Sequence, residues 1–112
     1  MNPILIHATE DDFTTLATVG APIGEQIAMT RVAGNTATPL GNAGIWECSP
    51  GRFRRQVPQA EFSYIIAGSG SFTPDGGETV AFGAGDSLWF APDTQGEWDI
   101  RETVRKAYLI IG

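Results

Sequence analysis

Short runs of alternating apolar and polar residues fill most of the chain, and glycine or proline separates one run from the next. Runs of this length, closely spaced and bounded by turn residues, predict many short β-strands arranged as a sandwich or barrel. The segment 35–42 ("NTATPLGN") and the segment 74–78 ("PDGGE") are expected to break strands. The strand-like runs are 25–34, 44–51, 61–68, 69–74, 79–82, 87–92, 97–102 and 104–112.

One segment before these runs, residues 8–20, has the pattern of a helix. Thr9 is placed to cap it, and Asp12 stands three residues later, as in a capping box. Acidic residues fill the first turn, and Gly20 supplies a stop. Three apolar residues share one face at helical spacing: Phe13, Leu16 and Ala17. The pattern therefore predicts one short helix lying against the outside of the sheet.

The composition favours a small globular domain and argues against two classes of partner. The chain has 112 residues, of which 42% are hydrophobic and 18% charged, enough to bury one core. A net charge of −6 argues against binding to nucleic acids or anionic membranes, which both attract clustered positive charge. No apolar run approaches the roughly 20 residues that span a bilayer, and the start lacks the pattern of a secretion signal. Cys48 is the single cysteine, which fits a reducing compartment, so we expect a cytoplasmic protein.

Two glycine-punctuated blocks resemble the two motifs of the cupin superfamily. Glu61 and Gly68 have the E-x6-G spacing of the first motif, and "GDSLWFAPDTQGEW" begins the second at Gly85 and Asp86. Together with "GIWECSPGRFRR", "EFSYIIAG", "GEWDI" and "VRKAY", these blocks resemble the cupin subgroup that contains (S)-ureidoglycine aminohydrolase.

This resemblance implies a fold and an assembly. Residues 1–112 would form one cupin domain, an all-β double-stranded β-helix (a jelly-roll barrel) with the short N-terminal helix. Residues 1–43 would supply the N-terminal strand, the helix and the first barrel strands, and residues 44–112 would carry the cupin motifs. Small cupins commonly pair through their edge strands, so the resemblance also implies a homodimer.

The same resemblance implies a metal site in which most ligands have been replaced. The positions of the ligands in the ureidoglycine enzymes fall here on Arg55, Val57, Glu61 and Gly96, with Gln95 adjacent to the last. Val57 has no donor atom, and Arg55 brings a fixed positive charge to where a cation would sit. We therefore expect no bound metal and no cofactor, with Glu61 and Gln95 as remnants of the site.

A buried carboxylate at Glu61 needs a partner, and Arg55 is the candidate. If Glu61 faces the barrel interior, strand alternation turns Ser63 inward as well. The guanidinium of Arg55 would then replace the lost cation by pairing with Glu61. The alternative places Arg55 at the surface and Glu61 against a tyrosine or the backbone. The residues expected to face outward are Phe62, Tyr64 and Ile66.

Other residues allow two interpretations each. The aromatic residues Trp46, Phe90, Trp98 and Tyr108 either wall a pocket or, as we favour, fill a small barrel. Without a histidine base, Cys48 is expected to be a buried small residue.

The remaining charged residues near the motifs are equally open. Glu47 is either a second acid near Glu61 or a residue on the opposite face of its strand. Arg101, Arg105 and Lys106 are interpreted as solvated or interface charges, although Arg105 or Lys106 could serve an anionic ligand at the barrel rim.

Three functions follow, in order of preference. The first is a metal-free, non-catalytic cupin that binds a small molecule through residues of the barrel interior: Arg55, Glu61, Ser63, Trp46, Phe90, Trp98 and Tyr108. The second is a metal-dependent enzyme of the ureidoglycine aminohydrolase type. The third is a structural or regulatory homodimer with a filled barrel.

Overall fold

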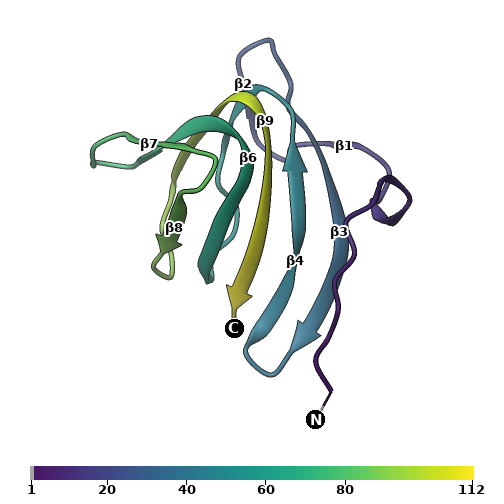
Figure 1. Ribbon diagram of the computed structural model, residues 1–112. Helices are drawn as coiled ribbons and strands as arrows, with labels where there is room; N and C mark the ends of the chain where they lie inside the picture. Colours follow the sequence, from purple (N-terminus) through teal and green to yellow (C-terminus); the bar gives the residue numbers. More distant parts are fainter. Residues whose placement is uncertain (1) are drawn as a thin grey trace.

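The computed structural model describes residues 2–112, whose regular secondary structure is almost entirely β-strand (Figure 1). One turn of 3-10 helix, η1 (Glu10–Asp12), precedes the strands. The strands are β1 (Ala17–Thr18), β2 (Pro22–Ile23), β3 (Met29–Thr38), β4 (Gly41–Cys48), β5 (Gly51–Arg54), β6 (Ala60–Pro74), β7 (Val80–Gly83), β8 (Ser87–Phe90) and β9 (Gly96–Ile111).

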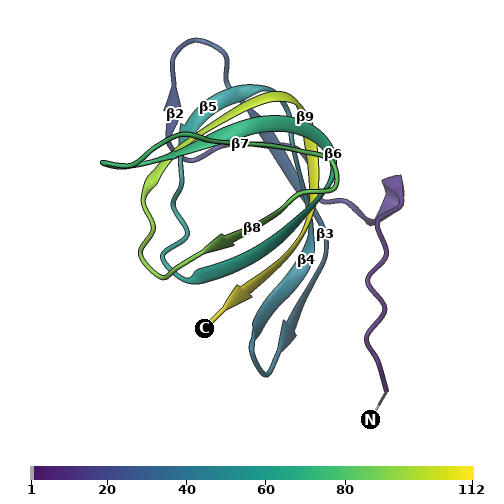
Figure 2. The same cartoon turned by 60° about the vertical axis from the view of Figure 1, so that its left-hand side comes forward.

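All the strands in the described part of the chain belong to one antiparallel sheet that curls into a barrel (Figure 2). The strand order is β1-β3-β4-β9-β5-β2, and β6 pairs with β7, β8 and β9. β9 pairs with β4 and β5 on successive parts of its length and also with nearly the whole of β6. β9 therefore joins β4, β5 and β6 in one curled antiparallel sheet, in agreement with the expected all-β jelly-roll barrel.

The two longest strands were predicted as pairs of shorter ones. The runs 61–68 and 69–74 form the continuous strand β6, and the runs 97–102 and 104–112 form most of β9. The register of β6 against β9 shifts three times between Ile65 and Gly70. Such bulges bend a strand without ending its ladder, so a local break in the pattern is not a turn here.

Gly68 explains why the first motif ends in glycine. Its φ is +90°, a left-handed conformation that side chains seldom adopt. A Cβ atom at this position would also collide with the carbonyl oxygen of Thr103 on the paired strand. The bulge after the inward-facing part of β6 therefore requires glycine.

The predicted N-terminal helix is wrong, although its capping signal is real. The side chain of Asp12 accepts hydrogen bonds from the backbone N–H and hydroxyl of Thr9, at 2.7 and 2.6 Å. The chain then turns extended instead of continuing as a helix: Phe13 bridges to Ala33, and the N–H of Thr14 donates to the carbonyl of Val32. Pairing with the edge of β3 satisfies these backbone groups, and the β-branched residues that follow favour extended structure.

The core is one cluster of aromatic and aliphatic side chains, and both β6 and β9 contribute residues of each kind. Ile65, Ile100, Val104 and Cys48 are fully or almost fully buried. The rings of Phe72, Phe82 and Phe90 surround Trp98 with centroid distances of 5.0, 5.8 and 5.4 Å. As the alternation predicted, Ser63 and Ile65 face inward, while Phe62, Tyr64 and Ile66 are exposed on the outer face. Within residues 2–112 there is no helix whose length and hydrophobicity would let it cross a membrane.

Candidate functional site

The carboxylate of Glu61 lies at the centre of a buried polar cluster inside the barrel. Glu61 is second in β6, and the alternation of that strand turns it inward with Ser63. Its Oε2 accepts hydrogen bonds from Lys106 Nζ and Ser63 Oγ, both at 2.7 Å. Its Oε1 lies 3.2 Å from Nη2 of Arg55. The side chain is therefore compensated by two cations and one hydroxyl.

Arg55 forms the pair with Glu61 that the sequence suggested, and it also holds two loops together. Its Nη1 donates to the carbonyl oxygens of Val57 and Thr94, at 2.7 and 3.0 Å. Its Nη2 donates to the carbonyl of Gln59 at 3.3 Å, and the guanidinium lies 4.3 Å from the ring centroid of Phe90. The loop before β6 and the loop before β9 are thus tied to the same buried side chain. The alternative of a surface Arg55 is wrong.

Lys106 was interpreted as a solvated, interface or rim charge, and the structure instead buries it inside the barrel. It is 5% exposed, and its Nζ lies 4.6 and 4.8 Å from the rings of Trp46 and Trp98. The signal was present in the sequence: residues two apart on a strand share a face, and Val104 and Tyr108 flank Lys106 at that spacing. The charge of lysine outweighed this periodicity in the prediction, because isolated buried lysines are rare.

The cluster shifts the pKa values of its acid and its amine. Burial by itself raises the pKa of Glu61, but the charge and hydrogen bond of Lys106, with Ser63 and Arg55, bring it below its ordinary value. Burial lowers the pKa of Lys106, and the nearby charge of Arg55 adds to this, while Glu61 opposes it. The carboxylate is therefore ionised at neutral pH, and the ammonium depends on that carboxylate for its compensation.

A cavity of about 300 Å³ opens beside this cluster. Arg55, Glu61 and Lys106 form its polar part. Its walls are largely apolar or aromatic and are formed by Val19, Val32, Trp46, Phe53, Val57, Trp98, Tyr108 and Ile110, with Thr18, Gly20, Thr30, Arg54 and Gln56 completing the lining.

The aromatic residues named from the sequence divide between the two roles that were left open. Trp46, Trp98 and Tyr108 line the cavity, whereas Phe90 is buried in the core and is not part of the lining. The Tyr108 hydroxyl donates to Oδ1 of Asn35 at 2.7 Å, and burial raises its pKa. Part of the barrel is filled, and part is hollow.

The positions of the family metal ligands do not assemble a ligand set here. Gln95 is exposed and does not line the cavity, and His7 is exposed in the N-terminal segment. A Cβ atom at Gly96 would lie 2.6 Å from the ring of Phe72, so this position has no space for a side chain. Across the part of the chain that the structure describes, no three His, Cys, Asp or Glu side chains gather as a metal site would need. The residues present therefore do not fit the metal that the fold suggests.

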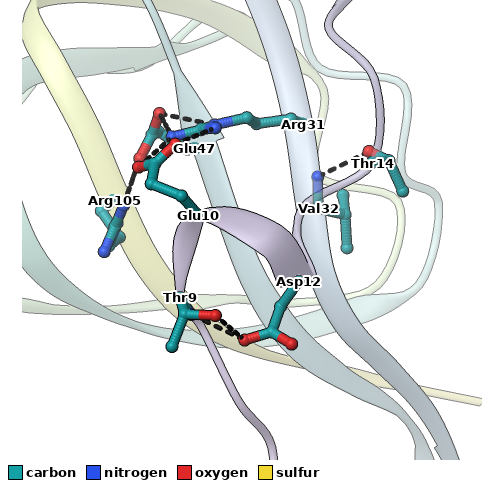
Figure 3. A network of polar contacts seen from close by, with 8 residues as sticks. All are labelled: Thr9, Glu10, Asp12, Thr14, Arg31, Val32, Glu47 and Arg105. Carbon is teal, nitrogen blue, oxygen red and sulfur yellow. Dashed lines mark hydrogen bonds and ion pairs between the residues drawn. The ribbon is translucent and has the colours of Figure 1, made fainter.

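Glu47 belongs to a separate network on the outer face of the sheet (Figure 3). Its carboxylate pairs with Arg31 at 2.8 Å and with Arg105 at 2.7 Å, and Arg31 also pairs with Glu10 at 2.9 Å. The guanidinium of Arg31 lies 4.2 Å from the ring centroid of Phe13. Glu47 and Arg105 are thus not part of the cavity, and their network fastens the N-terminal segment to β3, β4 and β9.

Cys48 is fully buried next to the cluster. Burial raises the pKa of its thiol to about 12. Its Sγ–H points at the carbonyl of the next residue, Ser49, 3.3 Å away. A thiol with this pKa is not a nucleophile at neutral pH, in agreement with the sequence-based interpretation.

Comparison with known proteins identifies the family. The family described as "EutQ-like cupin domain" matches residues 37–108 of this chain. These residues include β4 to β8, most of β9 and the whole buried cluster. The chain belongs to the EutQ-like cupins. No curated protein is similar enough to this cupin to count as a match.

Solved structures resemble this EutQ-like cupin over most of the barrel. A DUF861 family protein from Thermotoga maritima is 28% identical, with a TM-score of 0.58 over 60% of this chain and 76% of that chain. A putative ethanolamine utilization protein Q from Salmonella typhimurium is 17% identical, with a TM-score of 0.62 over 77% and 70% of the two chains. A DUF861 family protein of unknown function from Pseudomonas syringae is 20% identical, with a TM-score of 0.67 over 85% of this chain and 43% of the other. The last two likenesses show the fold alone.

Proposed function

We propose that this cupin binds a small organic molecule in the cavity beside Glu61, without a metal and without catalysing a reaction. The observation that carries the proposal is the cavity itself. About 300 Å³ of space, walled mainly by apolar side chains, meets a compact group of hydrogen-bonding residues. Small-molecule sites in proteins combine these two features, since apolar walls supply affinity and a few polar groups supply orientation.

A pair of variants tests whether ligands use this cavity. Val32 lines the cavity, so Val32→Phe should fill part of it, whereas Val80 is exposed outside the barrel and Val80→Phe serves as the matched control. A chemically diverse library of small molecules is tested for thermal stabilisation, because a ligand that binds only the folded state raises stability. Compounds that stabilise the wild type and Val80→Phe but not Val32→Phe support the proposal. A library without such compounds contradicts it.

The metal-dependent alternative, an enzyme of the ureidoglycine aminohydrolase type, has weaker support. Glu61 is the one family ligand position that still carries a ligand-type side chain in the cavity, and both of its oxygens already contact a cation. A metal ion would have to displace Lys106 or Arg55 against electrostatic repulsion. Metal analysis of the purified protein decides between metal-free binding and the metal-dependent enzyme. Stoichiometric Mn, Fe or Zn in the wild type that is absent from Glu61→Gln would favour the enzyme.

We also propose that two copies associate through the outer face of β6 and β8. Four exposed apolar side chains form this face, and none of its members is charged: Phe62, Tyr64, Ile66 and Trp89. Phe62 and Trp89 are directly opposite each other in the ladder, so the face is continuous. In a chain with a net charge of −6, an uncharged apolar face is the surface on which a second copy meets least repulsion. Tyr64→Lys should shift the mass measured by light scattering from dimer to monomer, and a wild-type monomer would refute the idea.

A further inference from the structure

The buried cluster carries one positive charge more than it balances. Arg55 and Lys106 face the single carboxylate of Glu61, and the three side chains are 2%, 7% and 4% exposed. The fourth charged residue of the lining, Arg54, is paired with Asp75 at 2.6 Å. Glu61 is the one carboxylate among the lining residues of the described chain. The excess positive charge therefore faces the cavity, although the whole chain is acidic.

Two kinds of contact stabilise the ammonium form of Lys106 against its burial, which favours the neutral amine. Nζ of Lys106 is 2.7 Å from Glu61 and lies near the rings of Trp46 and Trp98, whose π-faces attract an ammonium group. The guanidinium of Arg55 is permanently charged.

The same two cations have unused donors. Glu61 is the one protein acceptor that the structure gives to the Lys106 ammonium within residues 2–112, so two of its three N–H groups have no protein partner. Nε of Arg55 is also buried and unpaired among the described residues. Buried charges and donors without partners are costly, and an anion in the cavity would give the Lys106 ammonium the acceptors that it lacks.

We propose that the ligand of this cavity is an organic monocarboxylate with an apolar body, whose carboxylate is bound by Lys106. This assignment rests on the proposed function, small-molecule binding in the cavity. One negative charge neutralises the one excess positive charge. The apolar body would lie against Val19, Val32, Phe53 and Ile110, which are also lining residues. A dianion such as a phosphate ester would reverse the imbalance instead of removing it, and a cation would increase it.

A series of three similar probes tests this charge preference on the wild-type protein. Phenylacetate, phenylacetamide and 2-phenylethylamine share a phenyl ring and differ mainly in charge: negative, neutral and positive. Calorimetric titration at pH 7 should show phenylacetate binding at least tenfold more tightly than the amide, and no binding of the amine. Equal binding of acid and amide would overturn the monocarboxylate assignment while leaving small-molecule binding in the cavity intact.

Two variants test the role of Lys106. Lys106→Met removes the excess charge and leaves the Arg55–Glu61 pair, whereas Arg101→Met removes the same charge from an exposed position of the same strand. Phenylacetate should lose at least tenfold in affinity for Lys106→Met and keep its affinity for Arg101→Met. Unchanged affinity in a folded Lys106→Met would refute the assignment.

The outcome for the probes can be separated from the outcome for the proposed function. If none of the three probes binds, the assignment to apolar monocarboxylates fails. The proposal of small-molecule binding still stands if the library yields neutral compounds that stabilise the wild type and Val80→Phe but not Val32→Phe. It fails if the library yields no such compound.

Discussion

The charge balance of the cluster predicts that the negative charge of Glu61 contributes more to stability than the positive charge of Lys106. Glu61→Gln removes the one negative charge and leaves Arg55 and Lys106 buried together with two positive charges. Lys106→Met removes one of the two cations and leaves Arg55 and Glu61 as a neutral pair at 3.2 Å. Glu61→Gln should therefore cost much more stability than Lys106→Met, although both break the same 2.7 Å contact between Lys106 and Glu61.

The size of the difference follows from the burial of the partners. Stranding a buried charge by removing its partner costs about 3–5 kcal/mol. Lys106→Met loses a charge-assisted hydrogen bond but also removes a desolvated ammonium, and the methionine side chain fills the same space, so we expect a cost below about 2 kcal/mol. At roughly 4 °C per kcal/mol for a domain near this size, Glu61→Gln should lower the Tm by about 12–20 °C.

Thermal and urea unfolding at pH 7 measure both variants against the wild type. Glu97→Gln is the control for the loss of a carboxylate, since Glu97 pairs with Arg52, which is half exposed, and should cost at most about 1 kcal/mol. The double variant with both Glu61→Gln and Lys106→Met should be more stable than Glu61→Gln alone, because it removes one of the two stranded cations. If Lys106→Met proves as destabilising as Glu61→Gln, the charge balance described for the cluster is wrong.

Three further predictions concern acid, Arg55 and the buried thiol. The pKa of Glu61 is below its ordinary 4.5 in the folded protein. Its contribution to the free energy of unfolding is therefore complete above pH 4.5 and is lost as the pH falls through the lower pKa of the folded state. In a pH series of unfolding experiments, Glu61→Gln should lose less stability than the wild type on acidification. Arg55→Met leaves Lys106 and Glu61 as a neutral pair, but the three backbone carbonyls that Arg55 binds lose their donor at about 1–3 kcal/mol each, so it should cost more stability than Lys106→Met. It should also raise the pKa of Glu61 in an NMR titration, and unchanged stability together with an unchanged pKa would disprove the pairing. Cys48 should resist a thiol reagent at pH 7.5 in the folded protein and react fully after denaturation; fast labelling of the folded protein would contradict its burial.

Local signals in the sequence predicted most of the barrel. The alternation along β6 placed Glu61, Ser63 and Ile65 on the inner face, and the structure confirms all three. The helix expected over residues 8–20 is wrong, because the capping pair of Thr9 and Asp12 also stabilises a single turn. Whether that turn continues as a helix depends on the free edge of β3, which lies far away in the sequence.

The sequence by itself determined the β-class, the inward face of the first motif, the loss of the family's histidines and the need of Glu61 for a cationic partner. Each of these depends on residue type and on spacing within one strand, which are local properties. Only the tertiary structure decided that Lys106, 45 positions later, is a second partner, that Glu47 lies outside the barrel, and that the aromatic residues leave a cavity. These depend on how β6 and β9 are aligned and on how far the barrel closes, and no short segment encodes that alignment.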